Sequence, residues 1–135
     1  EWRPAVEEFN RYLKCNPKSA QGHLYRGQIK EKLGEIDAAI KDFKKATRLN
    51  PRYAEAYAAN AYAQLRKSKP NEKKIQALLN KAVRFGKTLA YPHYLLCNMV
   101  KDRNKSVARR HCNAYLKLAP KGEYVDMAKD LLRSL

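Results

Sequence analysis

The sequence predicts an all-α fold in which antiparallel helical hairpins stack into a solenoid. One observation is the helical spacing within residues 20–51, where Ala39, Phe43 and Ala46 follow one another at intervals of four and three. A second is an internal repeat, because an Ala-x3-Phe pattern with a following proline recurs 34 residues apart, Phe9 preceding Phe43. Units of this length are typical of helical repeat proteins.

Residues 20–51 contain one complete hairpin. Gly34 predicts the end of its first helix, because glycine adopts a positive φ at little cost. Pro51 predicts the end of the second helix, because proline cannot continue one. Gly27, in the middle of the first helix, is small enough to let the partner helix come close.

This pattern resembles the tetratricopeptide repeat (TPR), a family with a W-x2-L-G-x2-Y…A-x3-F…P signature and a period of about 34 residues. The chain matches the glycine, alanine, phenylalanine and proline, but has His23 and Arg26 at the aromatic and leucine positions. A common variant of the family carries arginine before the glycine and aspartate in the second helix. The resemblance therefore implies an Arg26–Asp42 ion pair, the alternative being that both side chains extend into water. It also implies a right-handed solenoid that binds other proteins.

The same spacing divides the rest of the chain. A second full hairpin begins 34 residues after Ala20, with a polar turn two residues longer and Asn71 as the N-cap of its second helix. The segment GEYVDMAKDLLRSL has one apolar stripe and predicts a helix that caps the solenoid. Residues 1–135 are thus predicted to be a single TPR domain: the second half of a repeat at 1–17, repeats at 20–51, 54–87 and 89–120, and a C-terminal capping helix at 122–135. Because the chain opens inside a repeat, we interpret it as a fragment of a longer protein.

Charge is the most unusual feature of the composition. With 29 Lys and Arg against 13 Asp and Glu, the formal net charge is +16, which indicates an anionic partner or surface. No run of 18 apolar residues predicts a membrane span. Two interpretations of the excess positive charge are open. The basic residues form either a solvated face that maintains solubility or a face that contacts nucleic acid, acidic protein or anionic lipid. The residues of this basic face are Lys67, Lys69, Lys73, Lys74, Arg109 and Arg110.

No motif in the sequence predicts catalysis or a cofactor. The chain has no G-x-S-x-G, no glycine-rich phosphate loop and no conspicuous carboxylate pair. We therefore expect a non-enzymatic protein without a bound cofactor.

Three cysteines without a CxxC motif do not form a disulfide framework and favour a reducing, cytoplasmic compartment. Cys97 and Cys112 occupy packing positions, so we expect reduced core thiols and no metal. The alternatives are a zinc site that adds His93 and His111, and a Cys97–Cys112 disulfide.

The TPR resemblance implies a concave groove lined by the first helix of each hairpin. A protein–protein interaction scaffold that holds a peptide or helix there is the expected function. The alternative is a basic adaptor whose convex face contacts nucleic acid or an anionic membrane surface. The lysines, asparagines and arginine of the two-carboxylate clamp are absent, so a chaperone C-terminal tail bound through that clamp is not expected. Carried over position by position, the groove residues are Leu24, Gln28, Tyr62, Leu65, Tyr91, Tyr94 and Asn98.

Overall fold

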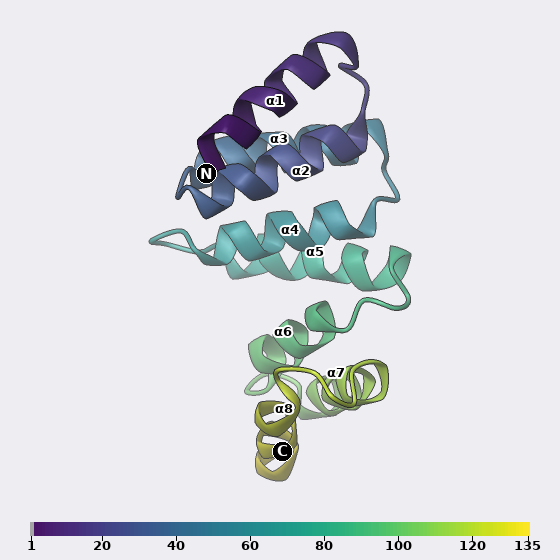
Figure 1. Cartoon of the computed structure of the whole chain (residues 1–135). Coiled ribbons are helices and arrows are strands. Elements are labelled where there is room, and N and C mark those ends of the chain that lie inside the picture. Colours follow the sequence, from purple (N-terminus) through teal and green to yellow (C-terminus); the bar gives the residue numbers. More distant parts are fainter. Residues whose placement is uncertain (1) are drawn as a thin grey trace.

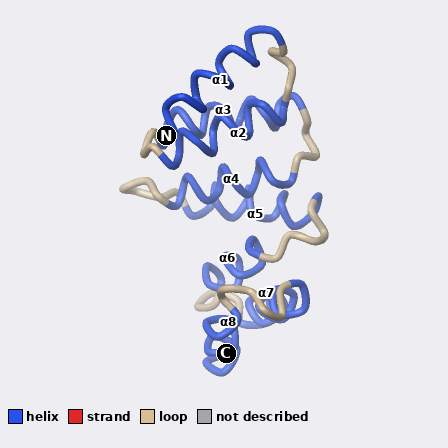
Figure 2. Tube along the Cα trace, viewed as in Figure 1, coloured by secondary structure: helices blue, strands red, loops and turns tan. Residues whose placement is uncertain are grey.

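The computed structural model describes residues 2–135, and within this range the chain consists of helices joined by turns (Figure 1). The connections are short, and the described residues contain no strand (Figure 2). Residues 2–135 form eight helices: α1 (Trp2–Cys15), α2 (Ala20–Lys32), α3 (Ile36–Leu49), α4 (Ala54–Leu65), α5 (Glu72–Phe85), α6 (Tyr91–Val100), α7 (Lys105–Leu118) and α8 (Val125–Ser134).

Consecutive helices pack against each other along the whole chain. The hairpins α2–α3, α4–α5 and α6–α7 stack in order, with α1 against α2 at one end and α8 against α7 at the other (Figure 1). This arrangement confirms the predicted all-α, TPR-like solenoid. Because each unit packs only on its neighbours, the stability of the solenoid depends on the interfaces between adjacent hairpins.

Phe43 is the centre of the first complete hairpin. It is fully buried, in a cluster with Leu24 of α2 and Ala56 of α4, and so packs between its own hairpin and the next. Gly27 makes room for it, because a Cβ atom there would lie 2.6 Å from Phe43 Cε1. The sequence prediction of a close helix approach at Gly27 is therefore correct.

The turn and capping residues predicted from the sequence have those roles in the structure. Gly34 has φ +84° and ends the α2–α3 turn, a conformation that strains other residues. Asn71 caps α5, accepting a hydrogen bond from the Lys74 amide at 3.1 Å, as predicted.

At the C-terminal end, α8 begins at Val125, three residues later than the predicted segment, and buries Ala128 against the α6–α7 hairpin. Among residues 2–135 no helix combines the length and apolarity required to cross a bilayer.

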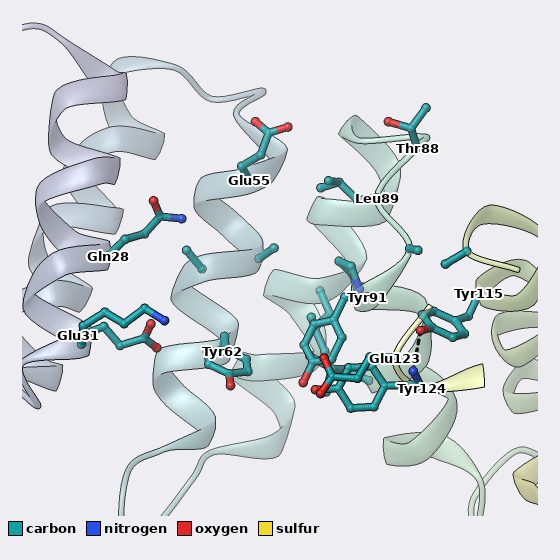
Figure 3. A pocket seen from close by; sticks show the side chains of 18 residues that line it. Gln28, Glu31, Glu55, Tyr62, Thr88, Leu89, Tyr91, Tyr115, Glu123 and Tyr124 are labelled. Atoms are coloured by element: carbon teal, nitrogen blue, oxygen red, sulfur yellow. Dashed lines mark hydrogen bonds between the residues drawn. The ribbon is translucent and has the colours of Figure 1, made fainter. Parts of the chain in front are cut away.

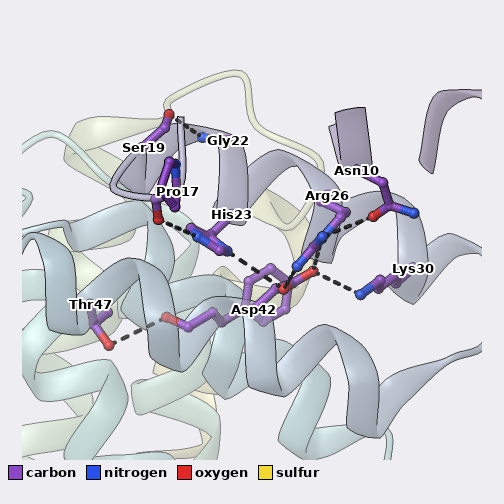
Figure 4. A network of polar contacts seen from close by, with 10 residues as sticks. Asn10, Pro17, Ser19, Gly22, His23, Arg26, Lys30, Asp42 and Thr47 are labelled. Atoms are coloured by element: carbon purple, nitrogen blue, oxygen red, sulfur yellow. Dashed lines mark hydrogen bonds and ion pairs between the residues drawn. The ribbon is translucent and has the colours of Figure 1, made fainter. Parts of the chain in front are cut away.

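The predicted Arg26–Asp42 ion pair is present at the α2–α3 interface (Figure 4). Arg26 donates from Nη2 and Nε to the two carboxylate oxygens of Asp42 at 2.7 and 2.9 Å, and Lys30 Nζ lies 3.2 Å from Asp42 Oδ2. Burial alone would raise the pKa of Asp42. The hydrogen bonds and charge of Arg26, followed by those of Lys30, outweigh burial and lower this pKa. Asp42 is therefore a buried carboxylate compensated by two cations.

The expectation that all cysteines are reduced is wrong, because Cys97 of α6 and Cys112 of α7 form a disulfide with a Cα–Cα distance of 5.3 Å. Both residues are fully buried, so their assignment to packing positions was correct. Sequence spacing placed each on an inward face but did not show that the two face each other across the hairpin. Cys15 is free and exposed. Within residues 2–135 no group of three or more His, Cys, Asp or Glu side chains is arranged to hold a metal ion.

His93 and His111 form a second link across the α6–α7 hairpin. Their Nδ1 atoms are 3.0 Å apart, so one imidazole donates a hydrogen bond and the other accepts it. Burial, followed by the neighbouring charges of His93 and Arg110, lowers the pKa of His111 to about 4. Burial also lowers the pKa of His93. Both rings are consequently neutral in the folded protein at pH 7.

We expect His111→Gln to make the stability of the protein less sensitive to mild acid. Below the ordinary histidine pKa of about 6.5 the unfolded chain binds more protons than the folded one, so stability is lost as pH falls from about 6.5 to 4. Between pH 7 and pH 5 the variant should lose about 1–2 kcal/mol less than the wild type, measured by chemical denaturation at these two pH values. Arg109→Gln, an exposed change on the same helix, is the control. Equal pH dependence in wild type and His111→Gln would contradict the prediction.

Candidate functional site

An open groove of about 710 Å³ runs across the inner helices α2, α4 and α6 (Figure 3). Helix α2 forms one wall and α4 the floor, while α6 and the segment that precedes α8 form the far end. Its size is that of an ordinary ligand site. The groove is therefore the main candidate for a functional site in this fold.

On the α2 side, Gln28 and Glu31 lie one helical turn apart and both line the groove. Glu31 is 9% exposed, and its Oε2 atom has no hydrogen-bond partner although Arg66 Nη1 lies 3.7 Å away. Burial raises the pKa of Glu31, while the charges of Arg66 and Lys32 oppose the effect. Arg66 also donates to the Glu31 carbonyl oxygen at 3.1 Å, which joins the ends of α2 and α4.

At the other end, tyrosines from α4, α6, α7 and the turn before α8 form a continuous aromatic cluster. Tyr91 stacks on Tyr124 with ring centroids 4.9 Å apart, and Tyr94 stacks on the same ring at 4.7 Å. The ring centroid of Tyr62 of α4 lies 5.9 Å from that of Tyr91, and the two ring planes are inclined at 59°, so these rings form a corner. Tyr115 holds Tyr124 in place, since its hydroxyl accepts a hydrogen bond from the Tyr124 amide at 2.9 Å.

The two tyrosines of α6 in this cluster, Tyr91 and Tyr94, are neutral at physiological pH. Burial, followed by the contact with Tyr124, raises the pKa of Tyr91 above its ordinary value. Burial also raises the pKa of Tyr94, and the neighbouring Tyr124 and Tyr115 add to this shift. The cluster therefore offers uncharged ring faces and hydroxyl groups, which suit apolar and hydrogen-bonding contacts.

Of the residues that the sequence assigned to the groove, Gln28, Tyr62 and Tyr91 line this one hollow. Leu24 does not face it, so that expectation is wrong: Leu24 is 2% exposed and packs on Phe43. Leu65 also lies elsewhere, partly buried against the core around Ile75. Both leucines lie on the side of their helix that faces the other helix of the hairpin. Their apolar side chains are removed from water there, which is favourable.

Tyr94 and Asn98 are separated from the main groove. They line a smaller hollow whose other wall belongs to α8, and the Tyr94 hydroxyl lies 3.4 Å from Met127 Sδ. The predicted single concave surface is therefore wrong at this end. The physical reason is that α8 contacts α6 as well as α7, so the cap covers part of the inner face.

Sequence reasoning missed several residues that line the groove, among them two carboxylates and two tyrosines. Glu55 begins α4, while Tyr115, Glu123 and Tyr124 come from α7 and from the turn before α8. The turn could not be placed from helical spacing, since its position depends on how α8 packs.

The residues of the basic face are all exposed, but they lie in two separate places. The four lysines belong to the α4–α5 turn and the first turn of α5. The two arginines lie on α7. Lys67 has a weak partner, with Nζ 3.5 Å from Asp37 Oδ1 of α3. Exposure agrees equally with a solvated surface and with a binding surface.

Comparison with known proteins identifies one repeat and one similar protein. Residues 20–53 match the tetratricopeptide repeat. A 77-residue stretch is 31% identical to the mitochondrial import receptor subunit TOM70 of Homo sapiens, covering 56% of this chain and 13% of that protein. The chain therefore contains a tetratricopeptide repeat, and the stretch similar to this curated relative spans a small part of that protein.

Solved structures share the fold at low sequence identity. YrrB, described as a TPR protein with an unusual peptide-binding site, superposes with a TM-score of 0.81 at 20% identity, over 94% of this chain and 63% of YrrB. The first TPR of Spaghetti (RPAP3), bound to the HSP90 peptide SRMEEVD, superposes with a TM-score of 0.71 at 21% identity, over 85% of this chain and 88% of that one. These likenesses place the fold among helical repeat scaffolds.

Proposed function

We propose that this chain is a non-enzymatic protein-interaction scaffold that binds a peptide segment of a partner in the groove between α2 and Tyr124. The observation that carries the proposal is the composition of the groove. It combines the accessible amide of Gln28 with the ring faces of Tyr62 and Tyr91 in one hollow of about 710 Å³. Amide groups can hydrogen-bond an extended backbone, while tyrosine provides large contact area at low entropic cost.

Relatives and physical chemistry both support a peptide as the occupant. RPAP3 and YrrB are TPR proteins whose descriptions include a bound peptide or a peptide-binding site. A peptide ending in two carboxylates is disfavoured here, because Glu31, Glu55 and Glu123 all line the groove and like charges repel at short range. The proposed partner is therefore a different kind of peptide from an acidic chaperone tail.

We expect the double variant Tyr62→Ala/Tyr91→Ala to lose at least tenfold in peptide affinity. Loss of ring contact area at the centre of an interface typically costs more than 1 kcal/mol per residue. The probe is the tightest-binding member of a random heptapeptide library displayed on phage and selected against the chain, with its affinity measured by calorimetry. Tyr12→Ala, which removes an exposed tyrosine of α1 outside the groove, is the matched control.

A charge reversal at Lys73 and Lys74 distinguishes binding through the basic face from binding in the groove. Both lysines are exposed at the start of α5. If Lys73→Glu/Lys74→Glu abolishes peptide binding while Tyr62→Ala/Tyr91→Ala leaves it unchanged, the groove proposal is wrong. Binding through the basic face would also weaken steeply with added salt, since it depends on exposed charges.

A further inference from the structure

The charge around the groove is opposite to that of the chain as a whole. Basic residues outnumber acidic ones 29 to 13 over the full sequence. Among the residues that line the groove, the acidic ones are Glu31, Glu55 and Glu123, and the basic one is Lys32. The lining of the groove is thus more acidic than basic, on a molecule whose net charge is strongly positive.

The two carboxylates at the rim of the groove are available to a ligand. Glu55 and Glu123 are exposed, and neither forms an ion pair within the part of the chain that the structure describes. Glu31, deeper in the wall, contributes a buried oxygen that lacks a hydrogen-bond donor. The exposed carboxylates lie on different elements, Glu55 on α4 and Glu123 beside Tyr124, so a bound chain would meet them at separate points (Figure 3).

The aromatic faces of the groove are also free of the chain's own cations. Elsewhere in residues 2–135, Arg52 lies 5.4 Å from the ring centroid of Phe85 and Lys81 lies 5.4 Å from that of Tyr57. Within the same range no cation lies over Tyr62, Tyr91 or Tyr124. The tyrosine rings and the unpaired carboxylates of the groove thus remain open to a cation from outside.

We propose that the groove selects a peptide carrying an arginine side chain, which lies against the Tyr62–Tyr91 corner and pairs with Glu123 or Glu55. This proposal rests on the proposed function and names its partner. Arginine fits better than lysine, because its planar guanidinium stacks on aromatic faces and also bonds carboxylates in a fork. The partner chemistry is thus opposite in sign to that of the acidic peptide seen in the RPAP3 structure.

The test begins from the heptapeptide selected above. Sequencing of the selected pool should show arginine enriched at one position over the unselected library. Replacing that arginine by citrulline, which keeps the shape and removes the charge, should weaken binding to the wild-type chain at least tenfold at about 150 mM salt. At this ionic strength the interaction between exposed charges more than about 8 Å apart is largely screened, so the difference in affinity reports a direct contact.

Two double variants test which carboxylates cause the discrimination between the arginine and citrulline peptides. In Glu55→Gln/Glu123→Gln the citrulline peptide should bind as well as the arginine peptide, within about twofold, because the carboxylates that distinguish them are gone. Glu7→Gln/Glu8→Gln removes two exposed carboxylates of α1 outside the groove and should retain the full tenfold discrimination.

The outcomes separate the two proposals. If selected peptides depend on Tyr62 and Tyr91 but lack arginine, or tolerate citrulline, the arginine proposal is wrong and the groove function stands. If peptide binding ignores the Tyr62→Ala/Tyr91→Ala change, or no peptide is selected, the groove function fails and the arginine proposal fails with it.

Discussion

Phe43→Ala is expected to destabilise the protein by about 3–5 kcal/mol, the usual range for removing a buried aromatic side chain. Phe43 is fully buried and contacts α2 while packing in a cluster that extends to α4. Its loss leaves a cavity that spans the interface between two hairpins. Since a solenoid is stabilised by these interfaces, the change should lower the cooperativity of unfolding as well as its midpoint. Chemical denaturation followed by circular dichroism measures both quantities.

The control for this prediction is Tyr62→Ala. Tyr62 is 42% exposed and contacts the rest of the chain through Tyr91, so its removal should cost less than about 1 kcal/mol. A free energy of unfolding for Phe43→Ala within 1 kcal/mol of the wild type would contradict the packing described here.

Asp42→Asn is expected to cost about 3 kcal/mol, the scale of breaking a buried ion pair. The substitution preserves the size of the side chain but leaves Arg26 and Lys30 largely buried without a counter-charge. Because the pKa of Asp42 is lowered in the folded state, its contribution is present above the ordinary pKa of about 4 and is lost as pH falls below it. The difference between Asp42→Asn and the wild type should therefore shrink below pH 4.

Asp37→Asn provides the matched control on the same helix. The Asp37 side chain is 89% exposed and lies 3.5 Å from Lys67, and exposed pairs of this kind contribute about 0–1 kcal/mol. Equal losses for Asp42→Asn and Asp37→Asn, or a loss for Asp42→Asn that does not change between pH 7 and pH 3, would show that the buried network is not stabilising.

The candidate site was predictable where it depended on helix register. Gln28, Tyr62 and Tyr91 follow from the family pattern, because corresponding positions of stacked hairpins superpose. Leu24 was misplaced, because it lies on the face of α2 that packs on Phe43 and not on the face that lines the groove. Tyr124 and Glu123 were not predictable, because they lie in a turn whose path depends on the packing of α8.

The sequence by itself determined the helical hairpins and their order, and its resemblance to a known repeat implied the Arg26–Asp42 pair. These features depend on local spacing, on turn residues such as Gly34, and on contacts within a single repeat. Only the tertiary structure decided that Cys97 meets Cys112, that α8 separates Asn98 from the main groove, and that Glu55 and Glu123 lie around one aromatic hollow. Those contacts join residues from different elements, so they depend on the relative orientation of helices, which the spacing of residues along one helix does not specify.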